Sequence, residues 1–245
     1  MISFIITNYH STDELMHCLD DLERLPDAAT FEVIIVNNDK QSLSLPHRRF
    51  GAQKYHHIGR NVGYARANNA GLHHATQQYV CFLNPDTHSF SANLTDILNH
   101  LTPNTIAVPQ IRTEDGTPQQ WSVGDEVTLW NIIKNNMGLH KKPWHATDVR
   151  PVAWASGAAL FAHTASIKNI GGFDEAYFLY FEDVDLCKRL RDNGGRVLYV
   201  PHITLTHTAG ASSKKTRKKQ KKHYYTSQDL FFSKHVGAWH ARLLR

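Results

Sequence analysis

The chain has 245 residues, of which 41% are hydrophobic and 20% are charged, with 14 glycines and 9 prolines. This composition is that of a globular protein with a sizeable core, and it excludes a collagen-like, coiled-coil or largely disordered chain. The net charge of +5 has a local origin, because residues 214–222 carry seven positive charges and no acid, which leaves the rest of the chain at −2. The body and this basic segment therefore need separate explanations.

Three apolar runs in the first 103 residues have the character of strands buried on both faces: residues 2–7, 31–36 and 79–83. Apolar residues at helical spacing predict helices over residues 11–25 and 62–75, which lie between these strands. The resulting β-α-β-α-β order is typical of an α/β fold with a mostly parallel sheet. Polar residues follow the strands, at the edge where open α/β sheets bind ligands.

The pattern weakens after residue 103. Residues 106–108 suit a strand, whereas residues 113–150 are polar, have no clear period and are predicted to form an insertion that shapes a second pocket. Order then returns as a series of short elements: an apolar run at residues 153–162, a glycine turn at 171–172, a helix at 183–193, a strand at 196–200 closed by Pro201, and an amphipathic helix at 224–245.

The cysteines Cys18, Cys81 and Cys187 are far apart and show no Cys-x-x-Cys spacing, so they are predicted to be buried thiols of a reducing compartment. The apolar start of the chain reaches polar Asn8 too soon for a secretory signal peptide. No window approaches the roughly 18 apolar residues of a membrane span. These features predict a cytoplasmic protein.

Two acidic motifs are candidates for chemistry. In Asn84-Pro85-Asp86-Thr87, a carboxylate follows an apolar strand and is held by a rigid X-Pro turn, where it can bind Mg²⁺ or Mn²⁺ beside a diphosphate. The same residues are also a common turn sequence. Further along, Glu182 and Asp183 open a predicted helix, where carboxylates either stabilise the helix end or raise one another's pKa, as suits a general base. From these residues alone, both interpretations of each motif stay open.

The basic segment 214–222 and the aromatic residues after it admit three interpretations: a solvated connection, contact with an anionic membrane surface, and nucleic-acid binding. Contact with a membrane is favoured, because aromatic side chains suit the interface. Nucleic-acid binding is disfavoured, because the charge is confined to one segment and no RNA-binding aromatic signature is present.

In order and spacing, several segments form one series: Ile5-Ile-Thr-Asn-Tyr-His-Ser11, Val33-Ile-Ile-Val-Asn-Asn-Asp39, Asn61-Val-Gly-Tyr-Ala-Arg-Ala-Asn-Asn-Ala-Gly71, Leu83-Asn-Pro-Asp86, Ser156-Gly-Ala-Ala-Leu-Phe161, Gly171-Gly-Phe-Asp-Glu175, Tyr180-Phe-Glu-Asp-Val-Asp-Leu-Cys187 and Pro201 to His207. The series resembles the inverting family 2 glycosyltransferases of GT-A fold, especially the bacterial rhamnosyltransferase-like branch that builds surface polysaccharides. The resemblance covers roughly residues 1–212.

The resemblance implies a domain over residues 1–211, with a nucleotide-binding half (1–103) and an acceptor-binding half (104–211), and a basic, aromatic extension over 212–245. The implied reaction moves a sugar, first of all rhamnose, from a nucleotide-diphospho-sugar to a glycan or a polyprenyl-diphosphate-linked glycan. The products would serve lipopolysaccharide or capsule synthesis. A divalent metal (Mg²⁺ or Mn²⁺) and a peripheral position at the inner face of the membrane belong to the same picture. A metal-dependent nucleotidyltransferase is the alternative, although it gives Glu182 and Asp183 no clear task.

The resemblance also implies roles for individual residues. Asp183 corresponds to the catalytic base, and Asp86 and His207 to metal ligands. The other expected positions fall into a donor set and an acceptor set: Thr7, Asn8, Tyr9, Asn37, Asn38, Asn61, Gly63, Arg66, Asn84 and Asp86 for the nucleotide-sugar, and Trp154, Gly157, Phe173, Asp174 and Glu182 for the acceptor. For Phe173 a plain core role is the favoured interpretation.

The chain departs from the family pattern at two positions. Asn37 stands where Asp is frequent, and Asn84 stands at the first Asp of the metal-binding D-x-D. A neutral amide at position 84 brings an oxygen but no charge, which predicts weaker metal binding.

Overall fold

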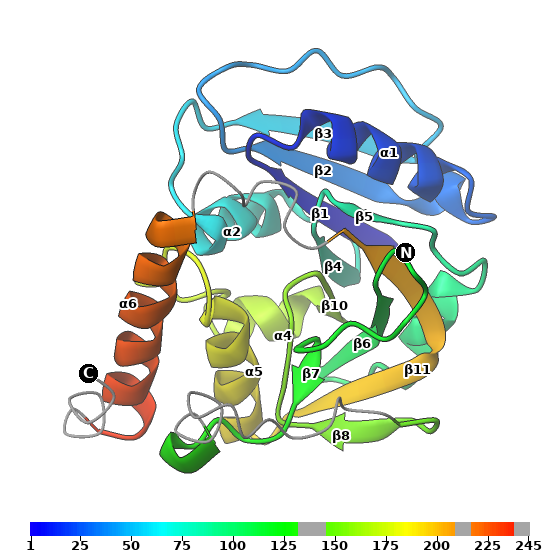
Figure 1. Ribbon diagram of the computed structural model, residues 1–245. Helices are drawn as coiled ribbons and strands as arrows, with labels where there is room; N and C mark the ends of the chain where they lie inside the picture. Colours follow the sequence, from blue (N-terminus) through cyan, green and yellow to red (C-terminus); the bar gives the residue numbers. More distant parts are fainter. Residues whose placement is uncertain (132–145, 209–216, 238–245) are drawn as a thin grey trace.

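The computed structural model describes residues 1–131, 146–208 and 217–237, which build an α/β fold on one large sheet (Figure 1). Its strands lie in the order β3-β2-β1-β4-β10-β6-β11-β5, and β8 also pairs with β11. They are β1 (Ile2–Asn8), β2 (Glu32–Asn37), β3 (Ala52–His57), β4 (Tyr79–Leu83), β5 (Thr87–His88), β6 (Thr105–Arg112), β8 (Arg150–Val152), β10 (Ala159–His163) and β11 (Arg196–His207). A small second sheet pairs β7 (Val123–Gly124) with β9 (Trp154–Ala155).

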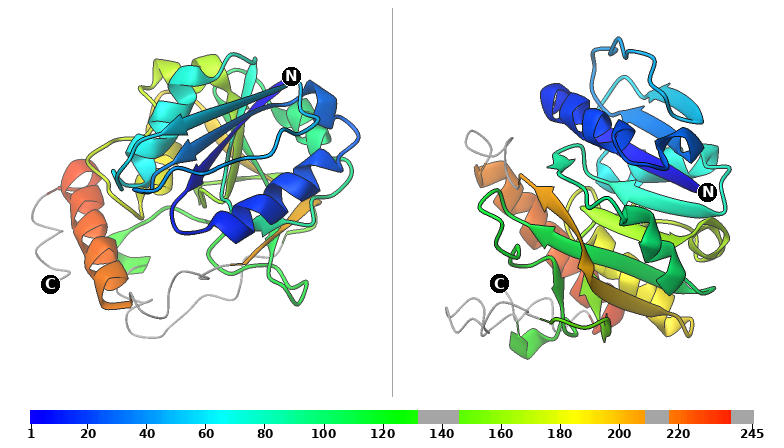
Figure 2. Two further views of the ribbon diagram at one scale, coloured as in Figure 1. Left: turned by 90° about the horizontal axis from the view of Figure 1, so that it is seen from above. Right: turned by 90° about the vertical axis from the view of Figure 1, so that its right-hand side faces the viewer.

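Helices cover both faces of the sheet (Figures 1 and 2). On one face α1 (Thr12–Glu23) shares an apolar cluster with Phe4 of β1, and on the other α2 (Tyr64–His74), α4 (Thr164–Asn169) and α5 (Glu182–Asp192) share a cluster with Ile5. Neighbouring residues of β1 thus enter opposite cores, because successive strand side chains point to opposite faces. Two 3-10 helices, η1 (Ala28–Thr30) and η2 (Leu94–His100), complete this region.

The predicted mostly parallel sheet is confirmed. β1 runs parallel to β2 and β4, β2 to β3, and β6 to β11. β4 has the predicted bounds, while β1 and β2 each extend one residue further, to Asn8 and Asn37. The three cysteines are free and buried, as predicted.

The sequence patterns missed β3 and the short strands β5, β7 and β8, and they ended another strand too early. β3 was missed because its residues are polar and mostly half-exposed, as suits a strand at the sheet edge. The prediction that Pro201 closes a strand was wrong, because β11 continues to His207. Its register against β6 shifts between Val200 and Thr204, and Pro201 lies in this irregularity. Proline is tolerated there because a bulge leaves ladder positions unpaired. The extension carries His207 to the ligand-binding edge.

The C-terminal helix α6 (Arg217–His235) begins earlier than predicted and includes the second half of the basic segment. Residues 214–216 and 238–245, which complete the predicted segments, lie outside the described residues. α6 packs through Phe231 and Phe232 against Tyr177 and Phe181 of the body. No helix in the described ranges combines the length and the apolar character that crossing a membrane requires.

Glu32 ties four segments together at the sheet end opposite the polar strand ends. Its buried carboxylate accepts hydrogen bonds from Ser3 of β1, from Lys54 of β3 (2.5 Å) and from both the backbone N–H and the hydroxyl of Thr76 (2.9 and 2.8 Å). Burial alone raises the pKa of this carboxyl. The hydrogen bonds outweigh burial and lower the pKa to about 2.

We predict that Glu32→Gln lowers the free energy of unfolding at pH 7 by about 2 kcal/mol, since it breaks charge-assisted bonds in a buried site. A carboxyl with a lowered pKa stabilises the fold above its unfolded-state pKa of about 4.3, and this contribution is lost as the pH falls toward 2. Urea unfolding at pH 7, 4 and 3 measures the effect. Glu175→Gln, at a half-exposed carboxylate, is the control. A Glu32→Gln deficit that is the same at all three pH values would contradict this assignment.

Candidate active site

Asn8 and Asn37 lie side by side where the parallel strands β1 and β2 end. The Asn8 side-chain amide donates a hydrogen bond to Asn37 Oδ1 (3.1 Å), and the Asn37 amide donates to the backbone oxygen of Gln41 (2.6 Å) and to Tyr55 Oη (3.1 Å). Both asparagines are fully buried. The predicted juxtaposition at the strand ends is therefore present.

Two buried polar atoms at this edge have no hydrogen-bond partner in the described structure: Thr7 Oγ1 and Asn8 Oδ1. Buried polar groups without a partner are costly, so a polar ligand that satisfies them is a natural explanation. Tyr9 follows with a ring that is 39% exposed. Arg66, also predicted for the donor site, forms an ion pair in which its guanidinium lies 3.5 Å from the Glu175 carboxylate.

A network of asparagines shapes the loop that leads into α2. Asn38 Oδ1 accepts a hydrogen bond from the Val62 backbone (2.9 Å), and its amide donates to Asn61 Oδ1 (3.2 Å) and to the Gly63 oxygen (3.3 Å). Gly63 has φ +91°, and a β-carbon there would lie 2.6 Å from the oxygen of Phe178. Glycine is required because the loop crosses this close to the acceptor half in a left-handed conformation. The N-terminus of α2 behind it favours an anion.

Asp86 and His207 meet beside Asn84, because β5 pairs with the end of β11 and sets Thr87 opposite His207. His207 Nε2 lies 3.1 Å from Asp86 Oδ1 and 3.2 Å from the Asn84 amide nitrogen. On the other side of the ring, Nδ1 lies 2.9 Å from Gln119 Oε1. That oxygen can only accept, so Nδ1–H donates to it, and Nε2 is the ring nitrogen that a neutral His207 would offer to a metal ion.

This arrangement fits a divalent metal in its chemistry but is not a complete protein cage. Two lone-pair atoms 3.1 Å apart match neighbouring ligands of an octahedral ion, which are separated by about 3 Å when each bond is about 2.1 Å. Within the described ranges, no three His, Cys, Asp or Glu side chains gather into a metal-binding group. Ions of the Mg²⁺ type are commonly held by one or two protein ligands together with substrate phosphates.

Asp183 and Glu182 form a pair with unequal properties at the start of α5. Asp183 Oδ2 accepts a hydrogen bond from the Gly157 backbone (2.8 Å) and Oδ1 one from Val184 (2.8 Å). Burial raises the pKa of Asp183 more than these bonds lower it. Glu182 is only 5% exposed, and its Oε2 has no hydrogen-bond partner. Burial, followed by the charge of Asp183, raises the pKa of Glu182 well above its usual range. The backbone N–H groups therefore favour the charge on Asp183, whereas burial favours the neutral form of Glu182.

The backbone before Asp183 is strained. Tyr180 (φ +71°) and Phe181 (φ +66°) are consecutive non-glycine residues in the left-handed region. Such residues cost free energy and persist only where surrounding contacts enforce them, often at functional sites.

A two-residue stretch of backbone joins the candidate base to the candidate metal side. Gly157 donates its N–H to Asp183, and the next residue, Ala158, accepts the backbone N–H of Asn84 (3.0 Å). The stretch is in place because β10 follows it and pairs antiparallel with β4. This stretch of backbone thus connects the two predicted chemical motifs.

Phe173, predicted for acceptor binding, is only 1% exposed, and its ring packs edge-on against Phe82. Its acceptor role was wrong, and the core role is the correct interpretation. The Trp154 ring covers Gly124, where a β-carbon would lie 2.7 Å from it. The ring is therefore engaged in packing.

Asp174, also predicted for acceptor binding, is held in an ion pair. Its carboxylate pairs with Lys234 of α6 at 2.6 Å, a partner sixty residues away that local sequence could not reveal. Glu182 is buried, as described above, whereas Gly157 has the most direct contact with the site of the five predicted acceptor residues, through its bond to Asp183.

Two side chains at the site were not predicted. Gln119 orients His207, yet it comes from the aperiodic insertion, where no motif marks it. Tyr64 donates from its hydroxyl to the oxygen of Gly157 (2.7 Å) and so supports the residue that binds Asp183. Its place directly after the Gly63 loop was the available signal.

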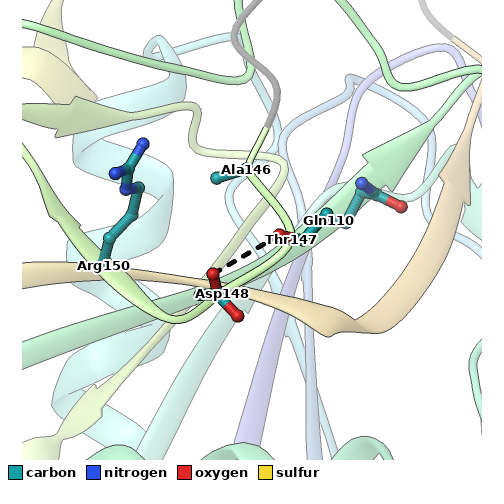
Figure 3. A pocket seen from close by; sticks show the side chains of 5 residues that line it. All are labelled: Gln110, Ala146, Thr147, Asp148 and Arg150. Carbon is teal, nitrogen blue, oxygen red and sulfur yellow. Dashed lines mark hydrogen bonds between the residues drawn. The ribbon is translucent and has the colours of Figure 1, made fainter.

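Two cavities lie near this edge or in the acceptor half. One, of about 300 Å³, has acidic residues of α1 on one side and Asp86 and Glu114 on the other. The other, of about 370 Å³, is lined by Gln110, Ala146, Thr147, Asp148 and Arg150 (Figure 3). Four of these five belong to the insertion that was predicted to shape a second pocket.

Comparison with known proteins gives a consistent result. Residues 3–161 match the family described as Glycosyl transferase family 2. The chain is 26% identical over 227 residues to Rhamnosyltransferase WbbL of Escherichia coli K12, which covers 85% of this chain and 84% of that protein. It is 27% identical over 198 residues to the Low-salt glycan biosynthesis hexosyltransferase Agl10 of Haloferax volcanii, covering 78% of this chain and 61% of that one.

The chain is also 37% identical over 95 residues to N-acetylglucosaminyl-diphospho-decaprenol L-rhamnosyltransferase of Mycobacterium tuberculosis. This match covers 38% of this chain and 31% of that protein. The chain thus spans only part of Agl10 and of the mycobacterial protein.

Among solved structures, GalNAc-T7 with UDP, GalNAc and Mn²⁺ superposes with a TM-score of 0.62 at 16% identity, over 95% of this chain and 50% of that one. Staphylococcus aureus TarS 1–349 with UDP-GlcNAc gives 0.59 at 16% identity, over 98% and 69%. These likenesses show the GT-A fold. Together with the family match over most of its length, they establish that the chain belongs to glycosyl transferase family 2.

Proposed function

We propose that the protein is an inverting glycosyltransferase that moves a sugar from a nucleotide-diphospho-sugar to an acceptor hydroxyl, with Asp183 as the base. The observation that carries the proposal is the Asp183 carboxylate, which has a raised pKa and is bound to Gly157 one residue away from the backbone that holds Asn84. A base with a raised pKa suits proton removal near neutral pH. A nucleotidyltransferase has no evident use for such a group.

In the proposed reaction, Asp183 takes the proton of the acceptor hydroxyl. The oxygen of that hydroxyl attacks the anomeric carbon of the donor. The bond from that carbon to the diphosphate oxygen breaks on the opposite face, so the configuration inverts. Burial holds the pKa of Glu182 well above its usual range, which disfavours a second negative charge beside the base. The buried amides of Asn8 and Asn37 and the unpartnered Thr7 hydroxyl are the groups that we assign to the nucleoside.

We assign the leaving diphosphate to the edge formed by Asn84, Asp86 and His207. Asp86 and His207 would hold a Mg²⁺ or Mn²⁺ ion, and Gln119 would keep the His207 lone pair directed toward it. Such an ion, when bound, neutralises charge that develops on the diphosphate.

Rhamnose as the sugar and a polyprenyl-diphosphate-linked glycan as the acceptor are proposals that rest on relatives. WbbL is named as a rhamnosyltransferase, and the mycobacterial relative is named as acting on a diphospho-decaprenol. We infer the same substrate class here, within synthesis of surface polysaccharide such as lipopolysaccharide or capsule.

We also propose that α6 contacts the anionic inner face of the membrane. Lys218, Lys219, Lys221 and Lys222 are exposed on its first turns, and Tyr225 is 51% exposed. Basic and aromatic side chains together suit such a surface, and a lipid-linked acceptor would require the enzyme there. We propose no nucleic-acid partner, because the positive charge is confined to this segment.

We predict that Asp183→Asn lowers kcat for sugar transfer by about 10²–10⁴-fold, because the base is lost. The matched variant Glu182→Gln reproduces the neutral state of Glu182 and is expected to lose less than about tenfold. The wild-type rate should fall as the pH drops through the raised pKa of Asp183, since the base must be ionised, and Glu182→Gln should keep this acidic limb. A folded Asp183→Asn enzyme with near wild-type kcat would exclude Asp183 as the base.

Asn84→Asp restores the charge of the family motif and is predicted to tighten Mn²⁺ binding in the presence of UDP or dTDP by about tenfold, whereas Asp86→Asn weakens it by a similar factor. Titration of Mn²⁺ by electron paramagnetic resonance measures free ion directly. Unchanged Mn²⁺ affinity in both variants would contradict the proposal that the ion binds at this edge.

Membrane contact predicts sedimentation with vesicles containing phosphatidylglycerol but not with neutral phosphatidylcholine vesicles, and loss of sedimentation above about 0.5 M salt. Replacing Lys218, Lys219, Lys221 and Lys222 with glutamine should abolish binding while leaving the buried side of the helix intact. Equal sedimentation of this variant would refute the proposal.

A further inference from the structure

α6 lies alongside α5 and contacts the segment that presents Asp183 (Figure 1). We name residues 179–185 the base turn. We propose that α6 is a positioning element: it holds the base turn in its strained conformation and thereby sets the place of Asp183. The inference rests on the proposed function only where it treats Asp183 as the base.

The base turn contains a strained backbone conformation that needs contacts from outside the turn to persist. Tyr180 and Phe181 adopt left-handed backbone conformations that residues with a β-carbon avoid. A free segment of this sequence would relax toward ordinary conformations, which would turn the following residues, including Asp183, in another direction.

α6 makes its first contact with the base turn at Leu179, just before the two strained residues. Ser227, which is buried, donates its hydroxyl hydrogen to the backbone oxygen of Leu179 at 2.8 Å. The Phe181 ring then packs against Phe231 (5.5 Å between centroids) and Tyr224 (5.4 Å). Phe231 and Phe181 are both buried, so the contact between these two rings is shielded from water.

The second contact of α6 with the base turn is at Asp185, two residues after Asp183. Asp185 is fully buried, and its carboxylate accepts hydrogen bonds from Lys234 (2.8 Å) and His235 (2.7 Å) of α6 and from Arg189 (2.6 Å) of α5. Lys234 also pairs with Asp174, before the base turn. The charge on Asp185 therefore binds α6 to the first turn of α5, two residues from the base.

The contacts of α6 at Leu179 and Asp185 lie on either side of Asp183 in the sequence. The hydrogen bonds of the Asp183 carboxylate come from Gly157 and Val184, whereas the Ser227 hydroxyl donates to Leu179 and the Lys234 ammonium donates to Asp174 and Asp185. An effect of Ser227 or Lys234 on the reaction must therefore act through the position of the base turn, which makes them positioning residues.

The test compares Ser227→Ala with Ser233→Ala, a matched change at an exposed position of the same helix. Hydrogen–deuterium exchange of peptides covering residues 179–185 should become about tenfold faster in Ser227→Ala and stay unchanged in Ser233→Ala. In the same samples kcat should fall about tenfold with the KM for the donor unchanged, because the Ser227 hydroxyl bonds to Leu179, in the acceptor half. Lys234→Met provides a second variant with the same expected pattern.

Tyr180→Gly in the Ser227→Ala background separates positioning from general damage. Glycine adopts the left-handed conformation without steric cost, so part of the lost kcat should return. Wild-type exchange and kcat in both Ser227→Ala and Lys234→Met would overturn the inference, as would a loss of kcat that Tyr180→Gly does not relieve. If exchange responds as expected but Asp183→Asn stays active, the positioning role stands and the proposed base is wrong.

Discussion

The hydrogen bond from the Gly157 backbone to Asp183 is the interaction on which the rest of the site depends. It joins a loop before the sheet strand β10 to the first turn of α5, and the neighbouring Ala158 binds the backbone of Asn84. Gly157 has little room for a side chain, since a β-carbon would lie 3.0 Å from the Tyr64 hydroxyl. The parallel strands bring the asparagines to one edge, and this short backbone bridge connects that edge to Asp183 at the start of α5.

Three carboxylates within four residues have different tasks because their surroundings differ. Glu182 is buried without a cation, and burial raises its pKa. Asp183 is stabilised by two backbone N–H groups and remains the ionisable member of the pair. Asp185 is buried too, but hydrogen bonds from Lys234 and Arg189 lower its pKa. Burial penalises a charge unless a partner compensates it, and α6 supplies that partner only to Asp185.

Local patterns predicted what depends on local chemistry. β4 was placed correctly because a continuous apolar run marks a strand buried on both faces, and the polar residues after the strands identified the ligand-binding edge. β3 carries no such run. Phe173 was misassigned because its surroundings come from Phe82, far away along the chain, and the pairing of Asp174 with Lys234 is equally hidden from local sequence. Gln119 had no signal, since its role arises only when β11 brings His207 beside it.

The last strand of the sheet to be synthesised, β11, is not at its margin. It pairs with β6, β5 and β8, so β6 has an open edge while the ribosome completes nearly a hundred further residues. Long-range pairing of this kind closes large loops and is slow. The nascent chain is therefore expected to expose an apolar strand edge until residue 207 has left the ribosome, and a chaperone that shields it would favour the correct sheet over aggregation.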